Sequence, residues 1–524
     1  MKTLLQLSGR LVAVTFLVLG FSSCDDDSGP SLTGDNTVYE LHSVSNPGIS
    51  GNVTFSKQSD NSVLVVIQLN GTQSGGNHPA HIHADNSVVG GSIVLDLENV
   101  EGATGRSETV VTAWNDGSPV TYEELIQFDG HVNVHAAPDN LGTLIAQGDI
   151  GGNVLTGESK SYPLSPVADP NIDGSILFEE RENGETVVTI MLDGTSAGNS
   201  HPAHIHNNSA AEGGGIAIDL NAVDGATGMS VTNVTQLNNG TAITYDEMLN
   251  FDGYAQVHLS TDNMGTFIAQ GDIGGNELTG ESEVYDLGPV SDPNIHGTAT
   301  FAKRKNGFTL VTIQLEGTTD GNSHPAHIHN NTAAEGGGIA VDFKPVVGAT
   351  GISKTTIRKL NDDTPVTYDD LITFNGYAQV HLSSDNLGTL IAQGDIGQNA
   401  LTGDEVEYIL ESASDPGISG TVTFAKRVNG TTLVTIELEG TTAGGDHPAH
   451  IHNNSVEEGG PIAIDLTNVN GATGISKTQV TGNRDGELFT YDDMIVYNGY
   501  VQVHLSADNL GTIIARGNIG SNAD

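Results

Sequence analysis

The sequence predicts an all-β protein of four tandem Greek-key domains, each a β-sandwich or flattened barrel. The chain has 524 residues, enough for about three to five domains of ordinary size. Glycine is frequent, at 67 residues, and charged residues make up 16%, a composition typical of β domains with many tight turns. The string His-Pro-Ala-His-Ile-His begins at His78, His201, His324 and His447, each 123 residues after the last. Four copies without length drift indicate four domains of one fold.

Residues 1–24 are predicted to be a lipoprotein signal peptide that ends in the lipidation cysteine, Cys24. A basic start precedes an apolar run at 11–19, which is short for a membrane span. The segment resembles a bacterial lipoprotein signal, although Phe21 stands where leucine is usual, and an ordinary signal peptide is the alternative. The acidic linker 25–36 contains three aspartates directly after the cysteine, which resemble the tag that sends Bacteroidota lipoproteins to the outer face of the outer membrane. The alternative interpretation of this acidic run is a solvated linker. If it is the tag, we expect a surface-exposed outer-membrane lipoprotein anchored by its lipid.

The repeat divides the rest of the chain into four predicted domains, at 37–159, 160–282, 283–405 and 406–524. Tyrosine, proline, phenylalanine and a later histidine recur with the same step. A unit of this length can bury its own core, so the pattern indicates a string of domains rather than a solenoid.

Within the fourth copy, short alternating segments separated by turns predict strands in a fixed order. Strands are expected at 408–410, 420–425, 432–438 and 462–466, with Asn429-Gly430 as a hairpin turn between the second and the third. One helical turn is expected at 490–494, where Thr490 can cap the first turn and acidic residues favour its positive end. Strands at 500–505 and 512–515 complete the unit.

Each copy carries three histidines that could converge on one point. Residues two apart in a strand face the same side, so His450 and His452 can direct both imidazoles together. If the strand that carries His504 is the neighbour, three imidazoles meet, which suits copper or zinc and is too rich in nitrogen for calcium or magnesium. The alternative is a polar histidine cluster bonded to backbone carbonyls. The predicted metal ligands are His81, His83, His135, His204, His206, His258, His327, His329, His381, His450, His452 and His504.

The first histidine of each string is predicted to sit in a turn and to brace the ligands through a hydrogen bond. These four residues are His78, His201, His324 and His447. Position 131 holds a histidine in the first copy but Tyr254, Tyr377 and Tyr500 in the others, which argues against a shared role for that histidine.

Charge and cysteine content exclude several classes of function. The chain has 18 Lys+Arg against 65 Asp+Glu, a net charge of −47, and such a polyanion repels nucleic acid. The single cysteine excludes an intrachain disulfide and a four-cysteine zinc site. No Ser-His-Asp order or phosphate-binding glycine loop is visible.

The order of these motifs resembles copper/zinc superoxide dismutase from end to end. The motifs are a tyrosine strand, an Asp-Pro-Gly turn, Gly-x-Val-x-Phe, His-x-x-His-x-His, a Val-His strand followed by Asn-Leu-Gly, and Ala-x-Gly-x-Ile-Gly. The tandem arrangement and shortened middle are similar to CHRD domains, the modules named from chordin. The resemblance covers nearly all of 37–520 and implies a dismutase-like Greek-key fold. It implies that His450, His452 and His504 match copper ligands, that His447 matches a framework histidine and that Asp465 matches a zinc-binding aspartate.

The departures from the dismutase pattern separate two functional hypotheses. No histidine lies between His452 and His504, so the bridging ligand and the remaining zinc histidines are missing, and Ile513 replaces the arginine that guides superoxide. The first hypothesis is a surface-anchored, non-catalytic CHRD-like binding lipoprotein. Each domain would hold a copper or zinc ion through three histidines, and an extracellular protein or glycan would be the partner. The alternative is a copper-only superoxide dismutase-like enzyme, whose anionic substrate the acidic body would repel. A spacer protein with relic histidines is the third.

Overall fold

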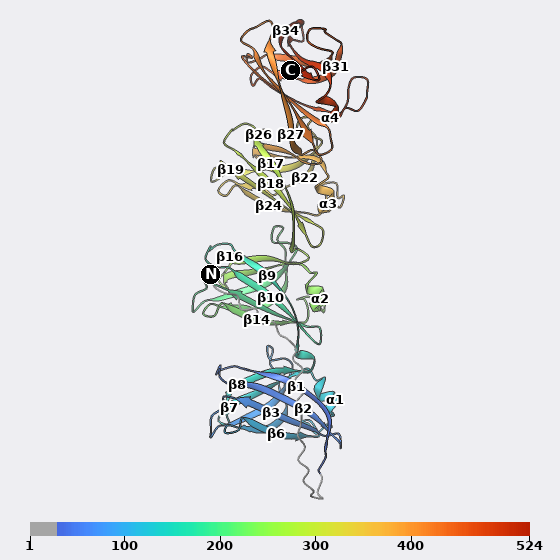
Figure 1. Cartoon of the computed structure of the whole chain (residues 1–524). Helices are drawn as coiled ribbons and strands as arrows, with labels where there is room; N and C mark the ends of the chain where they lie inside the picture. The colour runs from blue at the N-terminus through green and yellow to red at the C-terminus, as the bar shows by residue number, and fades with distance from the viewer. Residues whose placement is uncertain (1–28, 524) are drawn as a thin grey trace. The chain divides into compact units, whose positions relative to one another are not determined.

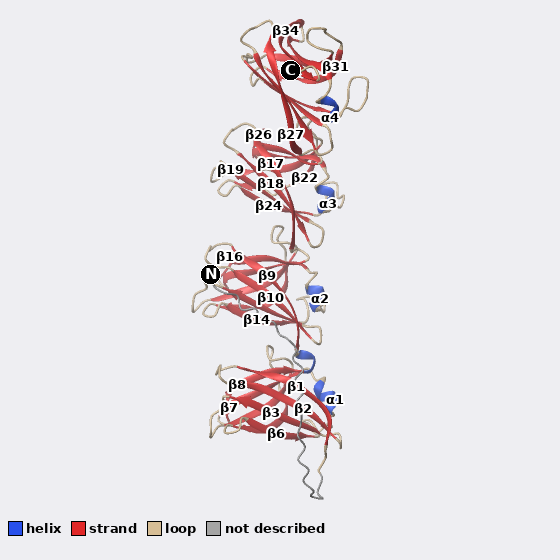
Figure 2. Cartoon of the chain, viewed as in Figure 1, coloured by secondary structure: helices blue, strands red, loops and turns tan. Residues whose placement is uncertain are grey.

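The computed structural model describes residues 29–523, so the predicted signal peptide and Cys24 lie outside the described residues. Strands dominate the described chain, and the few helical segments are single turns (Figures 1 and 2). The strands form four sheets, one for each copy of the repeat, which we call repeats 1 to 4 in chain order. The prediction of an all-β fold of four barrel-like domains is therefore confirmed.

Repeat 1 is a closed eight-stranded barrel with the order β1-β2-β3-β6-β5-β4-β7-β8. Strand β3 lies beside β6 rather than β4, and this crossover makes the topology a Greek key rather than a simple meander. The strands are β1 (Leu32–Ser43), β2 (Ser50–Gln58), β3 (Val63–Asn70), β4 (Asn77–Ala84), β5 (Ile93–Glu101), β6 (Arg106–Val111), β7 (Gly130–Ala137) and β8 (Asn140–Ile150).

Repeat 2 is a second closed barrel, with the order β10-β11-β14-β13-β12-β15-β16-β9. A single 3-10 turn, η1 (Gly151–Asn153), precedes it. Its strands are β9 (Leu155–Pro166), β10 (Gly174–Arg181), β11 (Thr186–Leu192), β12 (Ser200–Asn207), β13 (Ile216–Asp224), β14 (Met229–Val234), β15 (Asp252–Ser260) and β16 (Asn263–Gly274).

Repeats 3 and 4 follow the same strand order in sheets of ten and eight strands, which strand pairing does not close into barrels. In repeat 3 the strands are β17 (Leu278–Pro289), β18 (His296–Arg304), β19 (Thr309–Glu316), β20 (Ser323–His324), β21 (Ala326–Asn330), β22 (Ile339–Asp342), β23 (Val346–Val347), β24 (Ile352–Ile357), β25 (Asn375–Ser383) and β26 (Asn386–Gly397). In repeat 4 they are β27 (Leu401–Ser412), β28 (Ser419–Arg427), β29 (Thr432–Glu439), β30 (Asp446–Asn453), β31 (Ile462–Asn470), β32 (Ile475–Val480), β33 (Asn498–Ser506) and β34 (Asn509–Gly520).

One helical turn recurs in every repeat, and its cap explains why it forms. In α4 (Tyr491–Met494) the Thr490 side chain accepts from the backbone N–H of Asp493, whose carboxylate accepts from the backbone N–H of Thr490 in return. This capping box satisfies two amides that a short helix leaves unpaired. The equivalent turns are α1 (Tyr122–Ile126), α2 (Tyr245–Met248) and α3 (Tyr368–Leu371).

The core of each repeat lies inside its own sheet, since alternate residues of each strand point inward. In β3 the pattern is strict, with buried Val63, Val65, Ile67 and Leu69 at every second position. The recurring phenylalanine, Phe424 in repeat 4, is fully buried and meets Tyr408 edge to face at 5.3 Å between ring centroids. Burying such a ring stabilises the fold by roughly 1.5–3 kcal/mol.

The described chain divides into two compact units, one ending at Glu277 and the other beginning at Leu278, and each contains two repeats. Among residues 29–523, none of the helices has the length and apolar character needed to cross a membrane.

Two local expectations differ from the structure. His447 was expected in a turn but lies in β30, paired with Val469 across a register shift. Strand β32 was not expected, although its sequence Ile-Ser-Lys-Thr-Gln-Val pairs along β29. Its apolar Ile475 is exposed and its polar Ser476 is buried, so the sequence did not show the usual alternation.

Candidate metal centre

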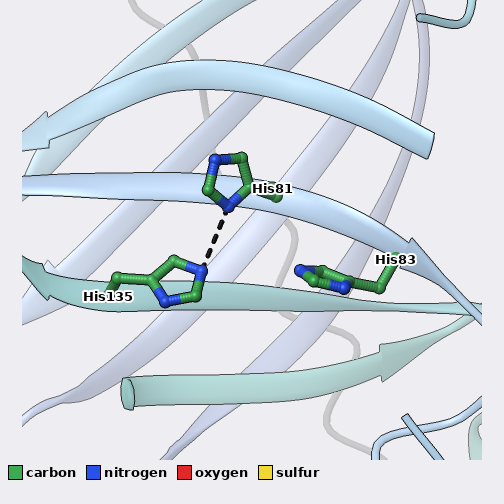
Figure 3. A group of neighbouring side chains, drawn as sticks. All are labelled: His81, His83 and His135. Carbon is green, nitrogen blue, oxygen red and sulfur yellow. Dashed lines mark hydrogen bonds between the residues drawn. The ribbon is translucent and has the colours of Figure 1, made fainter. Parts of the chain in front are cut away.

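The barrel brings the predicted ligands of repeat 1 together on two neighbouring strands. His81 and His83 lie two apart on β4, which pairs antiparallel with β7, and β7 carries His135 (Figure 3). One ligand nitrogen from each ring lies within 4.8 Å of the others. The equivalent histidines of repeats 2, 3 and 4 form the same groups, so all twelve predicted ligands fall into four clusters of three.

Hydrogen bonds to backbone carbonyls fix two of the three rings in each cluster. In repeat 1 the Nδ1–H of His83 donates to the Gly91 carbonyl at 2.9 Å, and that of His135 donates to the Leu141 carbonyl at 2.6 Å. A carbonyl can only accept, so Nδ1 carries the proton and Nε2 keeps its lone pair. The Nε2 atom of the second histidine is buried without a hydrogen-bond partner in every repeat, at His83, His206, His329 and His452.

The first ring of each cluster faces the site with Nδ1 instead. His81 Nδ1 lies 3.0 Å from His135 Nε2, and the same contact measures 3.0 Å and 3.1 Å in repeats 2 and 3 (Figure 3). Because Nε2 of His135 is the acceptor, the proton of this bond belongs to His81. Binding an ion through Nδ1 would therefore require the His81 proton to move from Nδ1 to Nε2, and nitrogens that share an ion at about 2.0–2.1 Å lie only about 3.4 Å apart. In repeat 4 the Nδ1 atom of His450 is buried and has no partner.

An aspartate on the adjacent strand lies on the far side of this first ring. The carboxylate of Asp96 is 3.8 Å from His81 Nε2, and Asp219, Asp342 and Asp465 lie 3.5–3.7 Å from their histidines. A carboxylate here favours the tautomer with the proton on Nε2, which leaves Nδ1 free to bind metal. The resemblance implied that Asp465 is a metal ligand. In the structure Asp465 lies beside His450 but outside the three-histidine group.

Burial favours the neutral form of the first histidine in each cluster. The pKa of His81 is lowered first by loss of solvent and then by the neighbouring His135, and the same causes lower the pKa of His204 and His327. In repeat 4 the effect is largest, and the pKa of His450 falls to about 4. Neutral imidazole is the form that binds a metal, so burial favours the protonation state that metal binding requires at these four rings.

The first histidine of each string contacts the backbone next to the third ligand. The Nδ1–H of His447 donates to the Leu505 carbonyl at 2.8 Å, one residue beyond His504. His78, His201 and His324 make the equivalent bond in their repeats. This bond ties the strand start to the strand that carries the third ligand, although the residue lies in the strand rather than in a turn.

An aromatic ring stacked on the second ligand was missed from the sequence. Tyr500 lies on His452 with the ring centroids 4.9 Å apart and the planes at 17°, and Tyr254 and Tyr377 do the same in their repeats. In repeat 1 His131 takes this place, stacked on His83 at 5.0 Å. The position therefore has a shared packing role, and the signal was its 123-residue recurrence on the strand paired with the ligand strand.

These features describe what the site can do chemically. Three imidazole nitrogens converge, their tautomers are largely set, and no described carboxylate joins the group. Such a donor set suits zinc or copper and leaves at least one coordination position for water or another ligand.

Comparison with known proteins gives no family. No family model matches the chain, and no curated protein matches it. Among solved structures, a chain titled "Biofilm associated protein - BSP domain" is similar at 10% identity, covering 97% of this chain and 100% of its own, with a TM-score of 0.14. A TM-score this low carries no argument about fold or function.

Proposed function

We propose that this protein is a surface-anchored binding lipoprotein in which each of four CHRD-like repeats holds one copper or zinc ion through three histidines, without catalysis. The observation that carries the metal half is the convergence of three imidazole nitrogens within 4.8 Å of one another in all four repeats, where the Nε2 atom of the second histidine is buried without a hydrogen-bond partner. A buried polar atom without a partner costs free energy, about 1–3 kcal/mol, which a bound ion would recover.

The alternative of a polar cluster bonded to carbonyls explains less. Carbonyls accept from Nδ1 of His83 and His135, but their Nε2 atoms then point inward at one another and at His81. The His81 Nδ1–H satisfies the Nε2 atom of His135, but the Nε2 atom of His83 faces the same point and has no donor. A cation supplies what the cluster lacks.

Metal analysis of the secreted part of the chain, from residue 28 onward, tests this function. We expect up to four equivalents of zinc or copper per chain after dialysis against trace metal, measured by inductively coupled plasma mass spectrometry. Substituting the second ligand in all four repeats, at His83, His206, His329 and His452, should abolish binding. Full metal content in that variant would refute the assignment.

The anchor and the location are a separate part of the proposal. They rest on the apolar run, Cys24 and the three aspartates after it. Incorporation of a labelled fatty acid into the wild-type chain but not into Cys24→Ala would support the anchor, and equal labelling of both would refute it. Protease shaving of intact cells tests surface exposure, and complete protection would place the protein on the periplasmic side. An extracellular protein or glycan is the proposed partner of the displayed domains.

A copper-only dismutase-like enzyme is the second candidate, and one observation in repeat 4 favours it. Arg484 forms an ion pair with Asp465 beside His450, and its charge contributes to lowering the pKa of His450 and His452. A cation this close to the cluster could attract superoxide locally against the overall charge. Dismutase turnover by the copper-loaded chain near the diffusional ceiling of about 10⁸–10⁹ M⁻¹s⁻¹ would favour this candidate, and loss of that rate in Arg484→Asn would locate it in repeat 4.

A further inference from the structure

Three arginines of the described chain are fully buried although each ends a strand, and two of them, Arg181 and Arg427, make the same set of contacts. Arg181 ends β10 of repeat 2 with 1% of its surface exposed, and Arg427 ends β28 of repeat 4 with none exposed. A buried guanidinium needs charge-paired and hydrogen-bonded partners to offset the loss of water. Both arginines find part of those partners in the repeat that precedes their own.

The charge partner is an aspartate on the last strand of the preceding repeat. Arg181 Nη1 donates to Asp149 Oδ2 at 2.7 Å, and Arg427 Nη1 donates to Asp395 Oδ2 at the same distance. The same nitrogens also donate to the backbone carbonyls of Asn153 and Asn399, in the short connection between the repeats. Each guanidinium therefore contacts the preceding barrel and the connection at once.

The second oxygen of each aspartate holds the loop that follows the metal ligands. Asp149 Oδ1 accepts from the backbone N–H of Ser87, and Asp395 Oδ1 from that of Ala333, both at 2.7 Å. These loops, 85–92 and 331–338, contain the glycine carbonyls that accept from the second metal-binding histidine. The Gly337 carbonyl accepts from His329 Nδ1 at 2.9 Å. A continuous chain of contacts thus runs from the arginine of one repeat to a metal-site imidazole of the repeat before it.

The aspartate has two roles, pairing with the arginine and holding the loop, and the first and fourth repeats show them separately. At its position repeat 4 has Asn518, whose Oδ1 still accepts from the backbone N–H of Val456 at 2.8 Å. An amide oxygen is therefore enough to hold the loop. At the arginine position repeat 1 has Gln58, which is buried and bonded within its own repeat to Ser62. The carboxylate and the guanidinium occur together in the sequence, 32 residues apart, at 149 and 181, 272 and 304, and 395 and 427.

We propose that Arg181 and Arg427 are positioning residues that seat repeat 2 on repeat 1 and repeat 4 on repeat 3 and, through the shared aspartate, steady the metal-site loop of repeats 1 and 3. The seating half stands on the ion pair alone, whereas the metal half rests on the function proposed above. The orientation of the second metal-binding histidine in repeats 1 and 3 then depends on a residue of the next repeat. A contact between domains becomes part of a metal site.

Hydrogen–deuterium exchange of the whole chain, read peptide by peptide, tests the seating. In Arg427→Gln we expect exchange at 398–401 and 331–338 to rise at least ten-fold, because the connection loses its partner and the unpaired Asp395 carboxylate no longer holds a fixed position for the loop. The equivalent loop of repeat 4, at 454–461, should not change. The matched control is Lys426→Gln, an adjacent cation whose ion pair with Asp492 is exposed. Unchanged exchange in Arg427→Gln, or the same rise in the control, would overturn the proposal.

A second variant keeps the test decisive if Arg427→Gln fails to fold. Asp395→Asn gives repeat 3 the residue that repeat 4 has naturally, so the loop should stay protected while 398–401 loosens. The double variant Asp395→Asn/Arg427→Gln removes both charges and should exchange less at 398–401 than the two single effects would predict when multiplied. Independent effects of the two substitutions would refute the pairing.

Zinc titration of the same chains tests the metal half. If the wild type binds four zinc ions, Arg427→Gln should weaken one of the four sites about ten-fold, as loss of a group that orients a ligand does. The control should bind as the wild type does. Four unchanged sites would overturn the metal half alone. A wild-type chain that binds neither zinc nor, in the same titration repeated with copper, copper would end the proposed function, and the exchange data would still decide the seating.

Discussion

Removing one ligand from one repeat, in His452→Ala, should cost the chain a single metal ion. The ring is held by its bond to Gly460 and stacked on Tyr500, and its Nε2 atom has no other partner. Structural zinc sites with four ligands bind with about 10–16 kcal/mol, or roughly 3 kcal/mol for each ligand. Since about 1.4 kcal/mol is a factor of ten, the affinity of repeat 4 should fall about 100-fold.

A competition titration with a chromophoric zinc chelator measures this loss. The wild type should surrender its ions in one range of chelator concentration, whereas the variant should surrender one equivalent about 100-fold earlier and three as before. His296→Ala is the matched control, because this histidine lies outside the clusters and its side chain is 54% exposed. The ligand assignment is wrong if His452→Ala releases all four equivalents together with the wild type.

Three further predictions concern the bracing residue, acid and the core. His447→Ala should weaken zinc binding by repeat 4 about ten-fold, less than loss of a ligand, because it acts through the Leu505 carbonyl; a 100-fold loss in the same titration would make it a ligand instead. The metal-free chain should lose stability as pH falls from 6.5 toward about 4. Because the pKa of buried His450 is lowered to about 4, the unfolded chain binds a proton in this window that the folded chain does not. Urea midpoints that stay constant across the window would contradict this. Phe424→Ala should destabilise repeat 4 by about 3–5 kcal/mol, seen as an earlier urea transition in peptides of that repeat followed by hydrogen exchange, whereas an unchanged transition would mean that the ring is not packed.

The parts of this structure that could be predicted from sequence depend on the spacing of residues close together in the chain. The His-x-His step places two rings on one face of any strand, and a capping threonine three residues before an acid marks a helical turn wherever it stands. The third ligand needed only the assumption that two strands are neighbours. These inferences hold because they depend on short-range geometry that the rest of the fold does not alter.

What could not be predicted depends on residues far apart in the chain. The bond from Arg427 to Asp395 joins two sheets, and no sequence pattern next to either residue identifies the other as its partner. The carbonyl of Gly460 sets the tautomer of His452 only because a loop folds back over the strand. Likewise, the stacking of Tyr500 on His452 follows from the register of β30 and β33, which the sequence of either strand alone does not set.

The ring stacked on the second ligand gives this protein built-in optical reporters. Copper(II) is a strong quencher of aromatic emission at short range, and Tyr254, Tyr377 and Tyr500 each touch a ligand ring at 4.9–5.0 Å between centroids. Repeat 1 has the non-fluorescent His131 in that place. Copper binding at repeats 2, 3 and 4 should therefore lower tyrosine fluorescence, whereas binding at repeat 1 should change it least.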